Sequence, residues 1–399
     1  MSVNIKDENL GEIIKILRQF GPISIKEISR LSRLSVPCVM QYLNHMLEQK
    51  LLVETINPAT AAGRKPKVYR MNHSCRYVVA VDLGGDCIKA GIADLSGALL
   101  VQKSIGLDAF RDETTLVEGV ISAVKELLTD SETALSSVDC MIIGNPGAVD
   151  PETGKIRMNA ASASWHELPI RKLFMEAFGR EVLVYNDVNL SAVGERVYGV
   201  GKGYDNFIYI RDDVGLKAGI VIHGALFEGE HNAAGEFGLN YFIDGRSSAT
   251  LKGTERIESR VSMHALVQQV RHAMPEQKED PLWAYVDGNP ALVDLETLVK
   301  VLDNPNTFVH GLTEDCARLL AYSVANLVLT LDIGLVVFGG EITRLHNHIL
   351  KPMRKMLNEL LPNPPTILLS ELGGESCMYG AISVGLEHAY KNLVSVLDV

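Results

Sequence analysis

The stretch VVAVDLGGDCIKAGIAD, residues 78–94, decides the fold: an apolar strand ends in an acidic-glycine turn, and a second strand returns from it. Its residues Lys89 to Ile92 recur as Lys217 to Ile220, and Gly-Ala-Leu follows closely in both places. Four matching residues are a weak signal alone, but the matching flanks indicate two copies of one supersecondary unit. The repeat therefore predicts two β-hairpin units that face each other across a cleft, in an α/β protein.

The composition is that of an ordinary globular protein. The chain has 399 residues, too many for one core, with 47% hydrophobic and 22% charged residues. No apolar run approaches the roughly 20 residues that cross a bilayer, and residues 1–10 are too polar for a signal peptide. Its six cysteines stand singly, which fits neither a disulfide framework nor a zinc site. We expect a cytoplasmic protein with reduced thiols and no contact with membranes.

Charge is distributed unevenly along the chain. Residues 1–72 hold 11 Lys and Arg against 6 Asp and Glu, whereas the remaining residues hold 27 against 43. A basic head on an acidic body is typical of a DNA-binding module joined to a sensor or an enzyme. A chance fluctuation in a short segment is the alternative.

The head has the pattern of a small helical domain with a β-hairpin. Helical periodicity predicts helices over 10–20, 25–32 and 36–49, and two short strands follow over 51–53 and 68–71. Ser24 with Glu27 has capping-box spacing before the second helix, while Ser35 can cap the third, with Pro37 in its first turn. Three helices and a hairpin predict a winged helix-turn-helix domain over residues 1–72.

In such a domain the third helix enters the major groove, and a basic wing reaches phosphates or the minor groove. Val36, Pro37 and Cys38 occupy the start of the third helix, which favours contact with thymine methyl groups or reading by the wing. A protein-interaction module is the alternative, but it leaves the basic wing without a purpose. The candidate DNA contacts are Ser35, Gln41, Asn44, His45, Arg64, Lys65 and Lys67.

Five motifs follow one another along the body. They are Asp82-Leu83-Gly84-Gly85, Asn145-Pro146-Gly147 with Asp150, Asn186-Asp187-Val188-Asn189, Ala234-Gly235-Glu236-Phe237-Gly238, and Ile257-Glu258 with Ser262. The last three match N-D-x-N, A-G-E-x-G and L-E-x-x-x-S, in that order. With these motifs the chain resembles the ROK family of repressors, open reading frames and kinases. Its head is similar to that of the family's xylose and N-acetylglucosamine repressors.

The resemblance implies an actin-like body of two ribonuclease-H-like lobes over 73–399. Lobe 1 would span about 76–185 plus the C-terminal helix, and lobe 2 about 186–380. In the family's kinases the aspartate at the place of Asp187 is the general base that takes the proton of the sugar hydroxyl. Asn186, Glu236 and Glu258 match residues that hold sugar hydroxyls, a role suited to groups that accept several hydrogen bonds. The alternative is that Asp187 merely caps a helix and that the two glutamates are loop or surface charges.

The phosphate loops depart from the family's pattern. Asp86-Cys87 replaces the Thr-Lys of D-x-G-G-T-K, and residues 211–219, RDDVGLKAG, replace a glycine-rich loop. Glu341 follows Gly339-Gly340 where the kinases usually have a third glycine. Glycine-rich loops let backbone N–H groups approach phosphates, whereas carboxylates repel them. Lys217 or Mg²⁺ would offset part of that repulsion. We therefore expect no ATP binding and no catalysis.

The zinc motif of the family, C-x-C-G-x-x-G-C, is missing too. Residues 246–258, RSSATLKGTERIE, contain no cysteine, and Leu239 stands at the place of the family's histidine. We expect no zinc and, since that histidine also reaches the sugar in the family, one sugar contact fewer.

These observations predict a sugar-responsive repressor that binds operator DNA as a homodimer or higher homo-oligomer, with a small sugar as effector and no cofactor. An active ROK sugar kinase with an appended DNA-binding domain is one alternative, and ATP turnover would identify it. A DNA-binding dimer that responds to no ligand is the other, and the absence of ligand-induced stabilisation would identify it.

Overall fold

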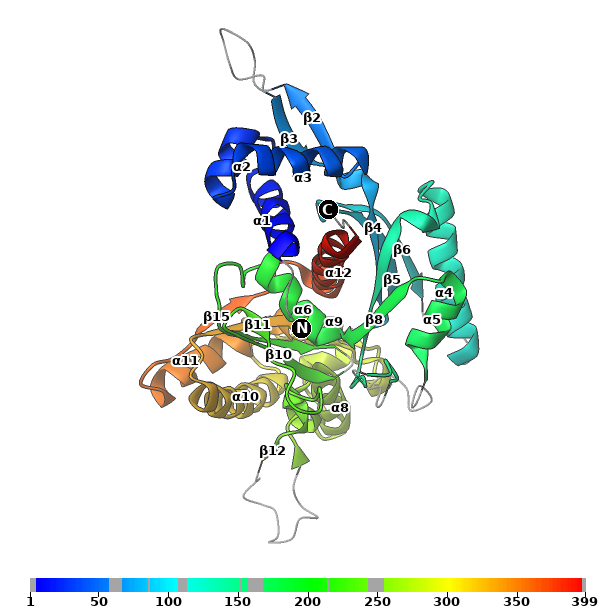
Figure 1. Cartoon of the computed structure of the whole chain (residues 1–399). Coiled ribbons are helices and arrows are strands. Elements are labelled where there is room, and N and C mark those ends of the chain that lie inside the picture. Colours follow the sequence, from blue (N-terminus) through cyan, green and yellow to red (C-terminus); the bar gives the residue numbers. More distant parts are fainter. Residues whose placement is uncertain are drawn as a thin grey trace.

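The chain forms an N-terminal head and two lobes, each built on a five-stranded sheet (Figure 1). This computed structural model describes residues 5–56, 67–84, 87–106, 113–150, 152–156, 168–213, 215–242 and 255–396. Within these ranges no helix is long and apolar enough to cross a membrane.

The head contains the three helices and the hairpin that the sequence predicts. Ser24 and Glu27 form the predicted capping box, and the Ser35 side chain accepts a hydrogen bond from the backbone N–H of Cys38. A short additional strand before the second helix pairs with the hairpin. The elements are α1 (Ile5–Phe20), β1 (Ile23–Ser24), α2 (Ile25–Ser32), α3 (Val36–Glu48), β2 (Leu52–Ile56) and β3 (Lys67–Met71).

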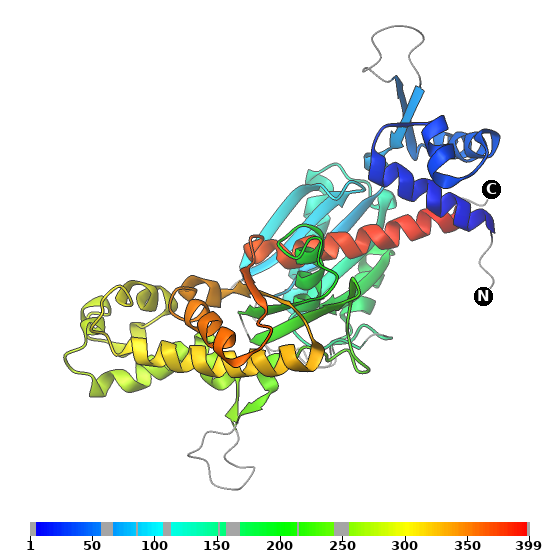
Figure 2. The ribbon, with the colours of Figure 1, turned by 90° about the vertical axis from the view of Figure 1, so that its left-hand side faces the viewer.

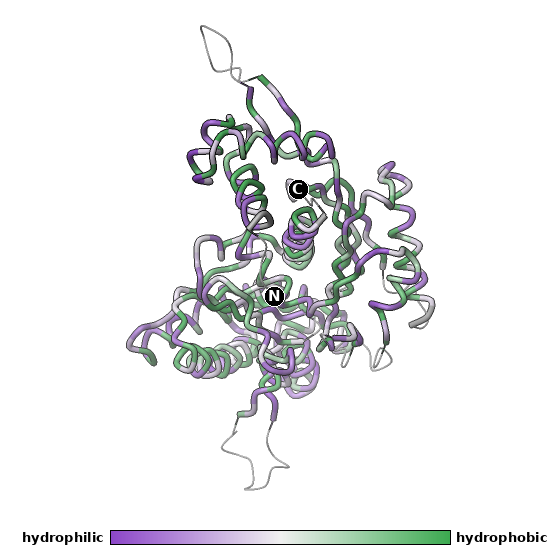
Figure 3. The backbone as a smooth tube through the Cα atoms, in the orientation of Figure 1, coloured by the Kyte–Doolittle hydropathy of each residue, from purple (hydrophilic) through white to green (hydrophobic). Residues whose placement is uncertain are grey.

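Lobe 1 is built on a sheet of strand order β6-β5-β4-β7-β8. The first three strands are antiparallel, and β7 and β8 continue the sheet in parallel. The elements are β4 (Tyr77–Asp82), β5 (Cys87–Asp94), β6 (Leu99–Gly106), α4 (Glu113–Asp130), β7 (Val138–Asn145), α5 (Ile170–Phe178) and β8 (Glu181–Asn186). Figure 3 shows that the strands are largely hydrophobic, as expected for strands buried on both faces.

Lobe 2 repeats this plan with the order β11-β10-β9-β14-β15 and the same strand directions. The sheet consists of β9 (Phe207–Asp212), β10 (Leu216–Ile222), β11 (Ala225–Leu226), β14 (Leu335–Gly340) and β15 (Thr366–Leu369). Around it lie β12 (Tyr241–Phe242), β13 (Glu255–Arg256), α7 (Glu258–Val261), α8 (Met263–Ala273), α9 (Leu295–Val301), α10 (Val309–Leu331) and α11 (Leu350–Leu360).

The two hairpins are equivalent residue by residue. Lys89 pairs with Asp82 across β4 and β5, and Lys217 pairs with Arg211 across β9 and β10. The repeat read from the sequence is therefore confirmed as a duplicated unit, and it places Asp82 and Arg211 at equivalent positions.

Two helices exchange between the lobes. α6 (Asp187–Val197) follows the last strand of lobe 1 but packs against β9 and β10, whereas α12 (Ser376–Val396) follows lobe 2 and packs against β4 and β7. The two helices touch backbone to backbone: a Cβ atom on Gly380 would lie 1.8 Å from the Leu190 carbonyl oxygen. A glycine is therefore required where α6 and α12 cross.

The far end of α12 supports the head (Figure 2). Buried residues of α1, such as Leu10 and Leu17, belong to the same apolar cluster as Leu386 and Leu393 of α12. The Arg18 guanidinium lies 4.0 Å from the centre of the Tyr390 ring, a cation–π contact. Head and lobe 1 thus share one hydrophobic core.

Candidate functional site

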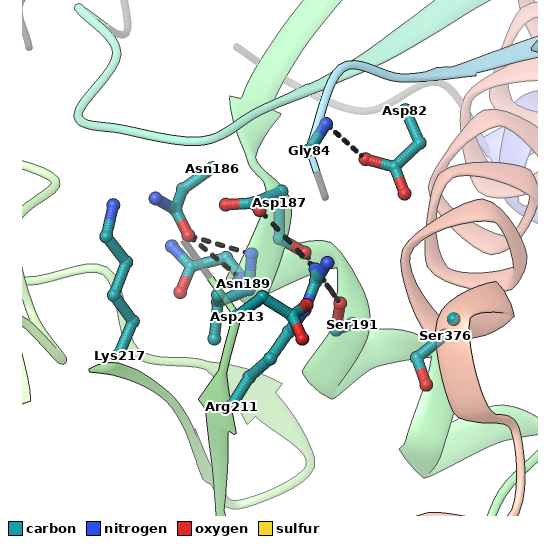
Figure 4. Close-up of polar contacts among 12 residues, drawn as sticks. Asp82, Gly84, Asn186, Asp187, Asn189, Ser191, Arg211, Asp213, Lys217 and Ser376 are labelled. Atoms are coloured by element: carbon teal, nitrogen blue, oxygen red, sulfur yellow. Dashed lines mark hydrogen bonds and ion pairs between the residues drawn. The ribbon is translucent and has the colours of Figure 1, made fainter. Parts of the chain in front are cut away.

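The site lies where lobe 1 passes into α6. Asn186 caps this helix: its Oδ1 accepts hydrogen bonds from the N–H groups of Val188 (3.0 Å) and Asn189 (3.2 Å), and its Nδ2 donates to the Gly147 carbonyl (3.1 Å). The alternative in which Asp187 caps the helix is therefore wrong. Since Asn186 does the capping, the Asp187 carboxylate is available to the residues around it (Figure 4).

A buried guanidinium pairs with that carboxylate. Arg211 at the end of β9 places Nη1 3.4 Å from Asp187 Oδ2, and its Nε donates to Asp213. The side chains of Arg211 and Asp187 are only 9% and 7% exposed. Burial raises the pKa of Asp187, and Arg211 and Lys217 oppose that rise. Burial also disfavours the charge on Arg211, but Asp187 and Asp213 outweigh it and hold the pKa of Arg211 above its usual value.

Arg211 is the site residue that the sequence analysis missed. The internal repeat could have revealed Arg211, because Arg211 occupies the position in the second hairpin that Asp82 occupies in the first. The two side chains lie close enough for Arg211 to lower the pKa of Asp82, although burial still raises that pKa to about 6.

Asp212, the last residue of β9, and Asp213, the next residue, lie in different environments. Asp213 lines the cleft, but Asp212 is completely buried below it, with Oδ2 accepting a hydrogen bond from the N–H of Met263 (2.8 Å). Asp212 therefore does not face the position where a phosphate would lie. Burial, together with Asp213, Glu341 and Glu258, raises the pKa of Asp212 to about 8, so this carboxyl is mostly protonated at neutral pH.

Glu236 and Glu258 lie on neighbouring segments of lobe 2. Glu236 precedes the short turn at 237–239, and its Oε1 lies 3.8 Å from Lys217 Nζ, within ion-pair range but beyond a hydrogen bond. Glu258 opens α7 beside that turn, since a Cβ atom on Gly238 would lie 2.8 Å from its Oε2. Lys217 thus stands between Glu236 and Asp187, and Glu258 packs against the turn that carries Glu236.

Two cavities are lined by neighbours of Asp187 but not by Asp187 itself. The smaller, of about 220 Å³, is lined by polar residues that include Asn186, Asn189, Tyr185 and Glu228. The larger, of about 670 Å³, lies between the lobes and is lined by Asp82, Lys89, Arg211, Asp213 and Glu341, with glycines 339, 340, 373 and 374. Asp86, Val214 and the segment 243–254 that would carry the zinc motif lie outside the described residues. In the part that is described, no group of three or more His, Cys, Asp and Glu side chains is arranged to hold a metal.

The candidate DNA-contacting residues fall on the outer side of the head. Ser35, Gln41 and Asn44 are exposed on α3, and His45 is half-buried. Lys67 opens β3 and pairs with Glu54 at 2.8 Å, so its charge is already balanced in part. Arg64 and Lys65 lie outside the described residues.

Comparison with known proteins finds similar chains among both repressors and kinases. The xylose repressor of Bacillus subtilis is 24% identical over 391 residues, which cover 96% of both chains. A glucokinase of Halalkalibacterium halodurans is 25% identical over 283 residues, covering 71% of this chain and 85% of the glucokinase. The fold matches a ROK family transcriptional regulator, a homologue of the Escherichia coli MLC protein, with a TM-score of 0.81 at 22% identity and 98% coverage of both chains.

The model of the ROK family matches residues 78–387, which include nearly all of both sheets, the helix α6, the first half of α12 and every residue that lines the two cavities. The chain belongs to the ROK family.

Proposed function

We propose that this protein is a sugar-responsive transcription repressor whose kinase-like body binds a sugar without phosphorylating it. The observation that carries the proposal is the path of α12: Cys377 at its start lies beside Asp82 in the cleft, and Tyr390 near its end supports the head. One rigid helix thus connects the cleft with the head. The match to a xylose repressor over nearly the whole chain supports the same function.

For DNA binding we propose a winged helix-turn-helix over 1–72, followed by the ROK body over 73–399. α3 would lie in the major groove, with Gln41 and Asn44 toward the bases, while the wing reaches the backbone. We propose a homodimer on a two-fold-symmetric operator, working in the cytoplasm where that DNA lies. Since α12 joins the head to the cleft, closure of the lobes around a sugar would alter the spacing of the two heads.

For the cleft we propose a sugar site without catalysis. A general base must be free to accept a proton, and although burial raises the pKa of Asp187, the Arg211 guanidinium already pairs with its Oδ2. Asp213 and Glu341 line the cavity where phosphates would lie, although Arg211 and Arg344 balance part of their charge. We propose neither ATP nor zinc as a cofactor.

A sugar kinase with an appended DNA-binding head is the second candidate, because a glucokinase is among the relatives and the larger cavity is retained. We expect no sugar phosphate from D-glucose, D-xylose or N-acetyl-D-glucosamine with Mg²⁺ and ATP. The measurement is chromatographic detection of the product, with the Halalkalibacterium glucokinase as positive control. Turnover at about 1 per second, ordinary for an enzyme, would establish the kinase instead.

The sugar response tests the proposed function directly. An operator selected from random DNA is titrated with protein, with and without the sugar that most raises the melting temperature. We expect the sugar to weaken binding about tenfold, which requires only ~1.4 kcal/mol of coupling. The double variant Asp187→Asn, Glu236→Gln should lose this response, because both hydrogen-bond acceptors at the sugar are weakened.

The matched control is Asp130→Asn with Glu359→Gln, which makes the same two chemical changes at exposed positions on α4 and α11. It should respond to the sugar like the parent. A full response in the Asp187→Asn, Glu236→Gln protein would place the sugar elsewhere, and no stabilisation of the parent by any sugar would reject a sugar-binding role.

A further inference from the structure

Every lysine and arginine that lines the larger cavity in the described part of the chain is already paired with a carboxylate. Lys89 Nζ lies 2.7 Å from Glu375 Oε1 and donates a second hydrogen bond to the Gly374 carbonyl. Arg211 pairs with Asp187 and Asp213. The third, Arg344, is about 3.1 Å from two glutamates. No basic side chain of these three is left to receive an anion.

The cavity also holds a carboxyl group without a cationic partner of its own. Asp82 is 2% exposed, and its Oδ1 accepts a hydrogen bond from the Gly84 N–H (2.9 Å). Burial raises the pKa of Asp82 to about 6, so it is largely ionised at pH 7. A phosphate group entering here would meet this charge, and to pair with Arg211 it would have to displace a carboxylate. Breaking a buried pair leaves one charge uncompensated, which is strongly unfavourable.

Two buried polar atoms near Asp187 remain without a hydrogen-bond partner. They are Asp187 Oδ1, an acceptor, and Lys217 Nζ, a donor. A hydroxyl group both donates and accepts, so neighbouring hydroxyls of one sugar ring can satisfy both atoms. A neutral polyol bound beside Asp187 would therefore satisfy both atoms without displacing a carboxylate from Arg211.

We propose that the cleft selects neutral sugars and rejects their phosphate esters, and that Arg211 with its carboxylate partners sets this preference. The proposal rests on the sugar-binding role proposed above and adds the class of ligand. Arg211 is decisive because its guanidinium stands between Asp187, which faces the sugar, and Asp213, which lines the cavity a phosphate would enter. The two acids hold the guanidinium in the cleft as an internal counter-ion.

The experiment compares each sugar with its own ester by titration calorimetry at pH 7.5. The probes are D-glucose and N-acetyl-D-glucosamine with their 6-phosphates, together with D-xylose and inorganic pyrophosphate. We expect the parent to bind its best neutral sugar at least about tenfold more tightly than the corresponding ester, since an unpaired like charge is strongly disfavoured. Pyrophosphate should not bind the parent.

Removing the carboxylate partners of Arg211 and Lys89 should weaken or abolish this selectivity. The double variant Asp213→Asn, Glu375→Gln keeps the shapes of both side chains. It removes one of the two carboxylates that pair with Arg211 and the carboxylate that pairs with Lys89. We expect this protein to bind the ester and pyrophosphate at least about tenfold more tightly than the parent does. Asp130→Asn with Glu359→Gln removes the same two charges outside the cleft and should change neither affinity. The single variant Glu375→Gln, at a partly exposed position, serves if the double variant does not fold.

The outcomes separate this inference from the function on which it rests. An ester that binds the parent as tightly as its sugar would overturn the selectivity and leave the sugar response standing. Unchanged anion affinity in the folded Asp213→Asn, Glu375→Gln variant would also overturn it, because the ion pairs would then not be its cause. A parent that binds none of the probes would refute the sugar-binding role itself, and the selectivity with it.

Discussion

Neutralising Arg64, Lys65 and Lys67 together will weaken DNA binding about a hundredfold or more at 0.1 M salt. Each phosphate that a basic side chain neutralises releases condensed counterions and adds about 0.9 to the slope of log affinity against log salt. Removing three contacts should therefore lower that slope by up to about 2.7, equally on operator and random DNA. Lys67 should contribute least, because Glu54 already pairs with it.

The measurement is fluorescence anisotropy of a labelled operator at four salt concentrations between 50 and 200 mM. Alanine at all three wing positions is compared with alanine at Lys351, Arg354 and Lys355, three exposed basic residues of α11 far from the head. The α11 variant should keep the parent's slope. If the wing variant kept it as well, residues 57–67 would not contact DNA.

The free energy of unfolding will fall as the pH rises from about 4 to 8, and Asp212→Asn will remove most of that fall. Burial and the nearby Asp213, Glu341 and Glu258 raise the pKa of the Asp212 carboxyl from 3.8 to about 8. The folded protein therefore keeps this proton up to about pH 8, while the unfolded chain loses it near pH 3.8. In that window the folded state binds more protons, so stability decreases by up to about 1.4 kcal/mol per pH unit.

Asp212 alone accounts for a fall of at most about 6 kcal/mol, and its contribution should level off near pH 8. Asparagine keeps an oxygen for the Met263 N–H and cannot ionise, so the variant should be more stable than the parent at pH 8. Urea titrations between pH 5 and 9 measure this through the fluorescence of Trp283, which packs against the lobe 2 core. Asp82→Asn is the control: the pKa of Asp82 is about 6, so it should change only the lower half of the window. A parent whose stability rises over this range would contradict the buried, protonated Asp212.

Local signals in the sequence predicted local structure well. The capping box at Ser24 and Glu27, the cap at Ser35 and the repeated hairpin are made of residues that interact within one turn or across one strand pair, so their spacing reveals them. The first helix begins at Ile5, earlier than the periodicity indicated, because its first turn lacks an apolar face.

The site was predicted only in part, because some of its contacts join residues that lie far apart in the sequence. Asp187, Glu236 and Glu258 were found through motifs, but the guanidinium that balances Asp187 comes from a strand 24 residues further along. Pairing across two elements leaves no periodic trace, and the same is true of the burial of Asp212. The contact between α1 and α12 joins the two ends of the chain, so no window of sequence contains it.

The exchange of helices also decides when lobe 1 and the head can complete their shared core during synthesis. The strands of lobe 1 leave the ribosome early, but α12, which covers β4 and β7, is made only after the strands of lobe 2. The head waits for the same helix, because its core is completed by Leu386 and Leu393. A nascent chain that has not yet reached α12 therefore carries a head without its support, and the head can complete its core only after both lobes have been made.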